Sequence, residues 1–282
     1  MSEKKSKDQI QEEVDEVLKR ERRCTVASSM GTGKTRMGVK DMDRHYSDYL
    51  RVLIAGPKIS TWDTWYTEIV QEMKKSYLLV HVRYVTYASL HKMSHDYDVL
   101  YLDEVHNLTE KHEPWLDKFK GEIRGFTGSL PRTKSKKGRL IQKFCPVKYV
   151  YSTDEAVDNK ILNDYRIIVH MLDLATAKTL KVKTKTGHFF TSEVESYLWW
   201  SAKLADASTP KEEEILRLMR MKALMNFDTK EKYTKLLQTR IRNKCIVFAN
   251  TKEQADRVCT HSHYSGNKDN DINLQMFKEG RI

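Results

Sequence analysis

The sequence predicts an α/β protein in which parallel sheets are covered by helices. Short apolar runs at 25–27, 52–55 and 99–102 are typical of strands that are buried on both faces. Segments whose apolar residues recur at helical spacing alternate with these runs. The same alternation begins again at 245–249, after a long helical stretch. We therefore predict two sheet-based domains, 1–163 and 164–282.

The first half is predicted to alternate regularly between helices and strands. A helix over 9–20 precedes the strand 25–27, and a glycine-rich segment then leads into a helix over 36–44. The strand 52–55 precedes a helix that carries Trp62 and Trp65, capped by Ser60 or Thr61. The remaining strands of this half are predicted at 78–80, 83–85, 99–102 and 124–129, the last of them ending in a turn.

The second half begins after a polar, basic segment at 131–139, which we expect to be a surface loop, and a linker at 153–164. Its strands are predicted at 166–172, 179–184 and 245–249. Its helices are predicted at 192–205, 211–226, 229–240, 252–259 and 271–277.

The composition narrows the class of protein and the kind of partner. Lys+Arg number 50 against 39 Asp+Glu, and the net charge of +11 favours a polyanion such as nucleic acid or, equally, a solubilising surface. The four cysteines are far apart without a C-x-x-C pair, so neither a zinc site nor a disulfide framework is expected. No targeting segment or membrane span is visible. We expect a soluble, cytoplasmic protein with no membrane partner.

The glycine-rich segment has the pattern of a phosphate-binding loop between a strand and a helix. Gly31 and Gly33 permit a tight turn whose amides point at one anion. Lys34 would reach the β- and γ-phosphates, and the Thr35 hydroxyl would bind Mg²⁺. The first position of the pattern is Ser28 instead of glycine. The predicted nucleotide-binding residues are Ser29, Met30, Gly31, Thr32, Gly33, Lys34 and Thr35.

An acidic pair follows the apolar strand 99–102. Asp103 would hold Mg²⁺ through water, and Glu104 would orient or deprotonate an attacking water. Asp-Glu at a strand end is often an ordinary solvated turn, but a phosphate loop upstream favours a magnesium-dependent nucleoside triphosphatase.

Asp103-Glu104-Val105-His106 resembles the DEXH box of superfamily 2 helicases and translocases, and other segments resemble the family's motifs in the same order. The loop is similar to motif I. The last residues of 126–129 resemble motif III, although Leu130 intervenes before Pro131. Pro57-Lys58, followed by Trp65-x-x-Glu68, resembles motif Ia and the W-x-x-E helix of the DNA-translocating branch of this family. The remaining similar segments are Thr86-Tyr87-x-x-Leu90 (motif Ib) and 246–251 (motif IV).

The resemblance implies two RecA-like domains, the second incomplete, with ATP and Mg²⁺ between them. It implies catalytic roles for Lys34, Asp103, Glu104 and His106, although His106 is expected to couple the box to its neighbours more than to bind metal. Gln11, or less favourably Gln9, would read the adenine. The implied nucleic-acid contacts are Pro57, Lys58, Thr86, Thr127, Asn250 and Thr251.

The function implied by the resemblance is that of an ATP-dependent DNA helicase or translocase. The alternatives are a DEXH RNA helicase and a non-catalytic, ATP-gated nucleic-acid-binding module completed by a partner chain. The family's motifs V and VI, which supply an arginine finger, are not found after 277–280. The chain alone is therefore expected to bind ATP and hydrolyse it slowly, with a partner or a missing C-terminal segment supplying the finger.

Overall fold

The computed structural model describes residues 4–184 and 186–282, which form two compact units, Met1–Arg166 and Ile167–Ile282. No helix in these described ranges is both long and apolar enough to cross a membrane.

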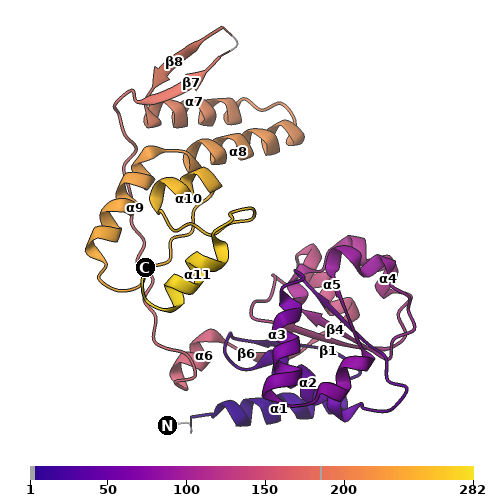
Figure 1. Cartoon of the computed structure of the whole chain (residues 1–282). Helices are drawn as coiled ribbons and strands as arrows, with labels where there is room; N and C mark the ends of the chain where they lie inside the picture. Colours follow the sequence, from indigo (N-terminus) through magenta and orange to yellow (C-terminus); the bar gives the residue numbers. More distant parts are fainter. Residues whose placement is uncertain (1–3, 185) are drawn as a thin grey trace. The chain divides into compact units, whose positions relative to one another are not determined.

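The first unit is built on a six-stranded sheet with the order β3-β2-β4-β5-β1-β6, in which every neighbouring pair is parallel. This confirms the parallel α/β sheet predicted for the first half. Figure 1 shows β1, β4 and β6 of this sheet among the helices of the unit. The strands are β1 (Arg23–Ser28), β2 (Val52–Gly56), β3 (Val82–Thr86), β4 (Val99–Asp103), β5 (Glu122–Thr127) and β6 (Val147–Tyr151). The helices are α1 (Lys7–Arg20), α2 (Lys34–Arg44), α3 (Thr61–Thr67), α4 (Glu113–Leu116), α5 (Lys136–Phe144) and α6 (Thr153–Asp158).

Two apolar cores cover the two faces of this sheet, because successive strand side chains point to opposite faces. On β2, Val52 and Ile54 pack with α1, α2 and α3, whereas Leu53 and Ala55 pack with α4 and α5. On β4, Tyr101 belongs to the first core, and its neighbours Leu100 and Leu102 belong to the second. The near-continuous apolar runs in the sequence reflect this burial on both faces.

A buried polar cluster crosses the first core. Asp41 on α2 is fully buried and accepts hydrogen bonds from Tyr101 Oη on β4 at 2.9 Å and from Arg124 Nε on β5 at 3.1 Å. Arg124 also donates to the carbonyl oxygen of Leu18 near the end of α1, at 3.0 Å. The guanidinium therefore satisfies a helix-terminal carbonyl and a buried carboxylate at the same time.

Two segments of the first unit differ from the sequence prediction. The expected strand 78–80 lies within a 3₁₀ helix, Ser76–His81, in which Leu78 is buried and Val80 is exposed. A short run of apolar residues is compatible both with a strand and with a helical turn that is buried on one side, so the sequence alone does not separate the two. The expected loop 131–139 is half helical, because Ser135 caps α5 by accepting a hydrogen bond from the Gly138 amide at 3.1 Å.

The second unit contains a two-stranded antiparallel sheet, β7 (Leu180–Lys183) with β8 (His188–Thr191), and a set of helices. The strand predicted at 179–184 is thus confirmed as β7. The helices are α7 (Glu193–Ala205), α8 (Pro210–Met225), α9 (Asp228–Arg240), α10 (Lys252–Val258) and α11 (Asn270–Lys278).

The strands predicted at 166–172 and 245–249 are wrong for this structure, since neither segment pairs in a sheet. Val169 and Phe248 are 80% and 93% exposed. A β-branched, apolar run forms a strand only where neighbouring strands bind its backbone and a packed layer buries its side chains. Among the described residues of the second unit, these two segments have neither a neighbouring strand to pair with nor a packed layer to bury their side chains.

Asp41→Asn should destabilise the first unit by about 3 kcal/mol, because it leaves the Arg124 charge buried without its main counter-charge. Hydrogen–deuterium exchange of peptides from β1 and β5 in increasing urea measures this unit alone. Lys143→Gln, which removes an exposed ion pair with Glu113 and Asp117 on the same unit, is the control and should leave the exchange midpoints unchanged. Equal midpoints for Asp41→Asn and wild type would contradict the assigned role.

Candidate nucleotide and nucleic-acid site

The predicted site residues of the first unit, apart from Gln11, gather at one edge of the sheet. Parallel strands present their carboxyl ends at the same edge, where ligands bind in open α/β sheets. The glycine-rich loop follows β1, Asp103 ends β4 and Thr127 ends β5. Pro57 follows β2 and Thr86 ends β3, so these two lie on the far side of β4 from the loop.

The glycine-rich loop is closed by its own hydroxyl groups. Gly31 and Gly33 have φ values of 79° and 87°, in the region that favours glycine, and α2 begins at Lys34 directly afterwards. Ser28 Oγ lies 3.0 Å from Thr32 Oγ1, which donates to the Ser29 carbonyl at 2.9 Å. Ser28 therefore replaces the usual first glycine without opening the loop.

Lys34 points into the loop rather than into solvent. Its Nζ donates to the carbonyl oxygens of Ser28 and Ser29, at 3.0 and 3.1 Å. Burial lowers the pKa of this ammonium group, and the negative charges of Glu104 and Asp103 oppose that shift. The lysine thus lies in the field of the acidic pair as well as against the loop.

The loop residues fit a phosphate group. Ser29 Oγ is buried without a hydrogen-bond partner in the described part of the chain, and Met30 and Gly31 on the outer side are exposed. Thr35 lies half-buried in the first turn of α2, where helix amides carry partial positive charge. The described residues contain no group of three or more His, Cys, Asp or Glu side chains that could hold a metal ion. Mg²⁺ is commonly held by one or two carboxylates together with phosphate oxygens, and Asp103 supplies one carboxylate at the same edge of the sheet as the loop.

Asp103, the first residue of the acidic pair, accepts hydrogen bonds from two aromatic side chains. Trp65 Nε1 on α3 donates to Asp103 Oδ2 at 2.9 Å, and Tyr87 Oη donates to the Asp103 carbonyl, also at 2.9 Å. Burial raises the pKa of the Asp103 carboxyl group. The hydrogen bond from Trp65 and the charge of Lys34 oppose this shift, and the Glu104 charge adds to it. Glu104 adopts a left-handed backbone conformation, φ 52°, which is unusual for a residue other than glycine and recurs at functional turns.

His106 lies between the acidic pair and the end of β5. Its Nδ1 lies 2.8 Å from Thr127 Oγ1 and 3.3 Å from Glu104 Oε2. Thr127 is fully buried, and its hydroxyl also donates to the Ser129 carbonyl at 2.8 Å. This burial does not favour the predicted contact of Thr127 with nucleic acid, and it places Thr127 between the acidic box and the turn that follows β5.

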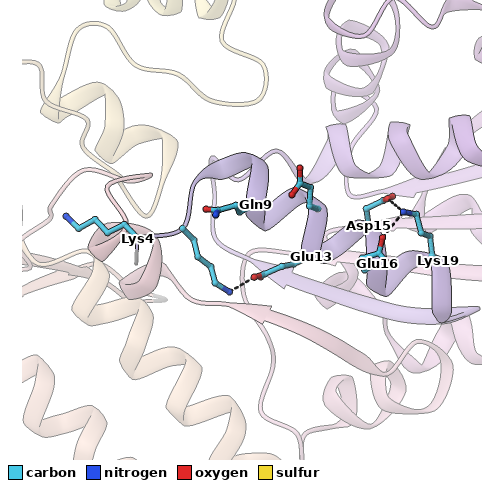
Figure 2. A pocket seen from close by; sticks show the side chains of 8 residues that line it. Lys4, Gln9, Glu13, Asp15, Glu16 and Lys19 are labelled. Atoms are coloured by element: carbon cyan, nitrogen blue, oxygen red, sulfur yellow. Dashed lines mark hydrogen bonds and ion pairs between the residues drawn. The ribbon is translucent and has the colours of Figure 1, made fainter. Parts of the chain in front are cut away.

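The structure separates the two glutamines considered for adenine recognition. Gln11 is buried, donates to the Thr32 carbonyl at 3.1 Å and accepts from Lys40 Nζ at 3.3 Å. Gln9 instead lines a charged hollow on the outer side of α1, where Lys5 pairs with Glu13 at 2.6 Å (Figure 2). The Gln9 side chain accepts from the Ser6 amide at 2.7 Å as part of a helix cap. Only Gln11 touches the loop.

The residues predicted to contact nucleic acid lie apart from the loop or in the second unit. Pro57 and Lys58 are exposed, and the Lys58 carbonyl accepts a hydrogen bond from Tyr84 Oη at 2.6 Å. Thr86 is half-buried at the end of β3. In the second unit, Thr251 caps α10, because its hydroxyl accepts a hydrogen bond from the backbone N–H of Gln254 at 3.1 Å. The backbone N–H of Asn250 donates to the Gln254 side-chain oxygen at 2.9 Å. Their roles toward nucleic acid stay predictions.

The sequence predicted a helical position for Trp65 but not its hydrogen bond to Asp103. It also predicted Tyr87 only as part of a motif, although its hydroxyl holds the Asp103 backbone. The signal was present in the order of elements. Trp65 lies on the helix after β2, and β2 pairs directly with β4, whose last residue is Asp103.

No family model and no curated protein matches the sequence. The chain is similar to the Sulfolobus solfataricus SWI2/SNF2 ATPase core in complex with dsDNA, at 12% identity and TM-score 0.42, over 95% of this chain and 73% of that one. It is also similar to the Pyrococcus furiosus Hef helicase domain, at 12% identity and TM-score 0.45, over 96% and 83%. A third likeness is to a nuclease-deletion mutant of the Type ISP restriction-modification enzyme LlaGI in complex with a DNA substrate mimic, at 13% identity and TM-score 0.40, over 100% and 29%. This level of likeness does not assign the chain to a family.

Gln11→Ala should lower the affinity for ATP about tenfold, because it removes a buried hydrogen bond to the loop and leaves the Thr32 carbonyl unsatisfied. Gln9→Ala, on the same helix but on its outer side, should leave the affinity unchanged. Titration of both variants with fluorescent ATP and GTP analogues measures the effect. A loss for ATP alone assigns Gln11 to the base, an equal loss for both nucleotides assigns it to loop support, and a loss with Gln9→Ala would overturn the assignment.

Proposed function

We propose that the chain binds ATP with Mg²⁺ and couples its hydrolysis to movement on nucleic acid, as a superfamily 2 helicase or translocase of the DEXH type. One observation carries the proposal. The phosphate-type loop and the acidic pair follow β1 and β4, which flank β5 on either side at the carboxyl edge of one sheet. At a strand spacing of about 4.8 Å, β1 and β4 are about 10 Å apart, which would leave room for the terminal phosphates between the residues that follow them.

The side chains divide the expected chemistry among themselves. Lys34 and the amides at the start of α2 would hold the terminal phosphates. Glu104, whose carboxylate lies beside His106 and Thr127, would orient and deprotonate the attacking water. A magnesium ion, held by Thr35 and Asp103, would neutralise charge that develops on the phosphate oxygens.

The nucleic-acid surface is proposed at the β2–β3 side of the same edge. Pro57 and Lys58 are exposed there, just before α3, and Thr86 lies at the end of the neighbouring strand. A lysine, a hydroxyl group and backbone amides can bind the phosphates of a nucleic acid. Such contacts do not depend on the base sequence. The net charge of +11 suits such a partner. DNA is preferred to RNA because the W-x-x-E and T-Y-x-x-L segments resemble the DNA-translocating branch.

Glu104→Gln should retain nucleotide binding and lose hydrolysis by about 10²- to 10⁴-fold, because it keeps the shape of the side chain and removes the general base. Lys34→Ala should lose nucleotide binding. The measurements are phosphate release and binding of a fluorescent ATP analogue, each with single-stranded DNA, duplex DNA and RNA.

The same assay separates the alternatives for the proposed function. Stimulation by RNA alone would identify an RNA helicase. Binding of nucleotide without phosphate release under all three conditions would favour the non-catalytic module. Unchanged phosphate release in Glu104→Gln would contradict the assignment of the base.

Lys58→Ala should weaken binding of single-stranded DNA of any sequence and reduce the slope of its salt dependence by about 1, because it removes one phosphate contact. Fluorescence anisotropy over a range of salt concentrations measures both quantities. Lys143→Ala removes the same charge from a helix on the other face of the sheet and is the matched control. Equal effects of the two substitutions would reduce the role of Lys58 to net charge.

A further inference from the structure

The indole of Trp65 is held rigidly in the first core. The residue is 1% exposed, and its ring centroid lies 5.8 Å from that of Tyr101. Gly38 on α2 lies directly beside the ring, since a Cβ at that position would approach the indole to 2.6 Å. A glycine at this point lets α2 and α3 come close enough to fix the orientation of the indole N–H.

The partner of this N–H distinguishes Trp65 from an ordinary core tryptophan. Trp115, which is also buried, donates to a backbone carbonyl, that of Met93, at 2.8 Å. Trp65 instead donates to a side-chain carboxylate oxygen, Asp103 Oδ2, at 2.9 Å. A hydrogen bond to a carboxylate is stronger than one to a carbonyl and leaves the second oxygen of that carboxylate available.

The Asp103 backbone is held as well, because Tyr87 donates its hydroxyl to the Asp103 carbonyl at 2.9 Å. Two aromatic donors from separate elements thus act on one residue at the end of β4. Groups that hydrogen-bond to a metal-binding carboxylate orient it and tune its affinity for the ion.

We propose that Trp65 is a positioning residue, whose indole N–H orients the Asp103 carboxylate for the divalent cation that accompanies the nucleotide. This inference rests on the proposed function. Trp65 does not touch the nucleotide in this assignment. Its effect is confined to the step in which the cation strengthens nucleotide binding.

The test compares Trp65→Phe with Trp62→Phe in the 282-residue chain. Phenylalanine keeps a ring in the core and removes the N–H donor, and Trp62, on the same helix, packs partly buried against the same core. Binding of a fluorescent, non-hydrolysable ATP analogue is titrated in EDTA and then with increasing Mg²⁺. We expect Trp65→Phe to bind like wild type in EDTA and to need about tenfold more Mg²⁺ for half-maximal tightening. Trp62→Phe should follow wild type in both conditions.

A double-substitution comparison separates positioning from general packing. In the Asp103→Ala background, adding Trp65→Phe should cause no further change in the Mg²⁺ requirement, because the group on which Trp65 acts is gone. An unchanged Mg²⁺ requirement for Trp65→Phe overturns the inference, as does an equal loss of binding with and without Mg²⁺. If wild type binds no nucleotide under either condition, the proposed function itself fails and the inference falls with it.

If Trp65→Phe does not fold, as judged by its thermal unfolding, β-(3-benzothienyl)alanine at position 65 replaces it. This side chain keeps the shape of the indole and carries sulfur in place of the N–H. The same tenfold shift in the Mg²⁺ requirement is expected, and wild-type behaviour overturns the inference.

Discussion

The buried ion pair between Asp41 and Arg124 is the interaction on which the first unit depends. It joins α2, the helix that begins at the loop lysine, to β5, the strand that separates the loop from the acidic pair. Tyr101 extends the same contact to β4, two residues before Asp103. Arg124 also donates to the Leu18 carbonyl near the end of α1, the helix that carries Gln11. Burying either charged group without the other would cost several kcal/mol of folding free energy, so the requirement to pair them restricts how these four elements pack.

The sequence was sufficient for the sheet of the first unit and insufficient for much of the second. Runs such as 52–55 and 99–102 have apolar side chains at successive positions, which only burial on both faces explains, and both are strands. The segment 245–249 has the same composition but does not pair in a sheet. Strand formation depends on neighbours far away in the sequence, and composition carries no information about whether they are present.

The order of the strands is enough to bring the candidate site residues to one edge of the sheet, whereas contacts that depend on packing were not predicted. The loop from Ser28 to Thr35 and the pair Asp103-Glu104 lie at one edge of the sheet, because the order of strands and their parallel direction suffice to bring them there. The bond between Trp65 and Asp103 joins residues 38 positions apart and depends on the close approach of Gly38. The burial of Thr127 likewise follows from side-chain packing that no local motif reveals.

Two carbonyl oxygens of the loop would compete with a bound anion for the ammonium group of Lys34. The ammonium group already contacts two carbonyl oxygens of the loop, Ser28 and Ser29, so an incoming anion gains only the difference between the new bonds and those two. A singly charged or poorly placed anion gains little from this exchange, whereas a polyphosphate offers several charged oxygens at once. If the loop binds a nucleotide as proposed, these two hydrogen bonds would therefore favour a polyphosphate over a singly charged anion.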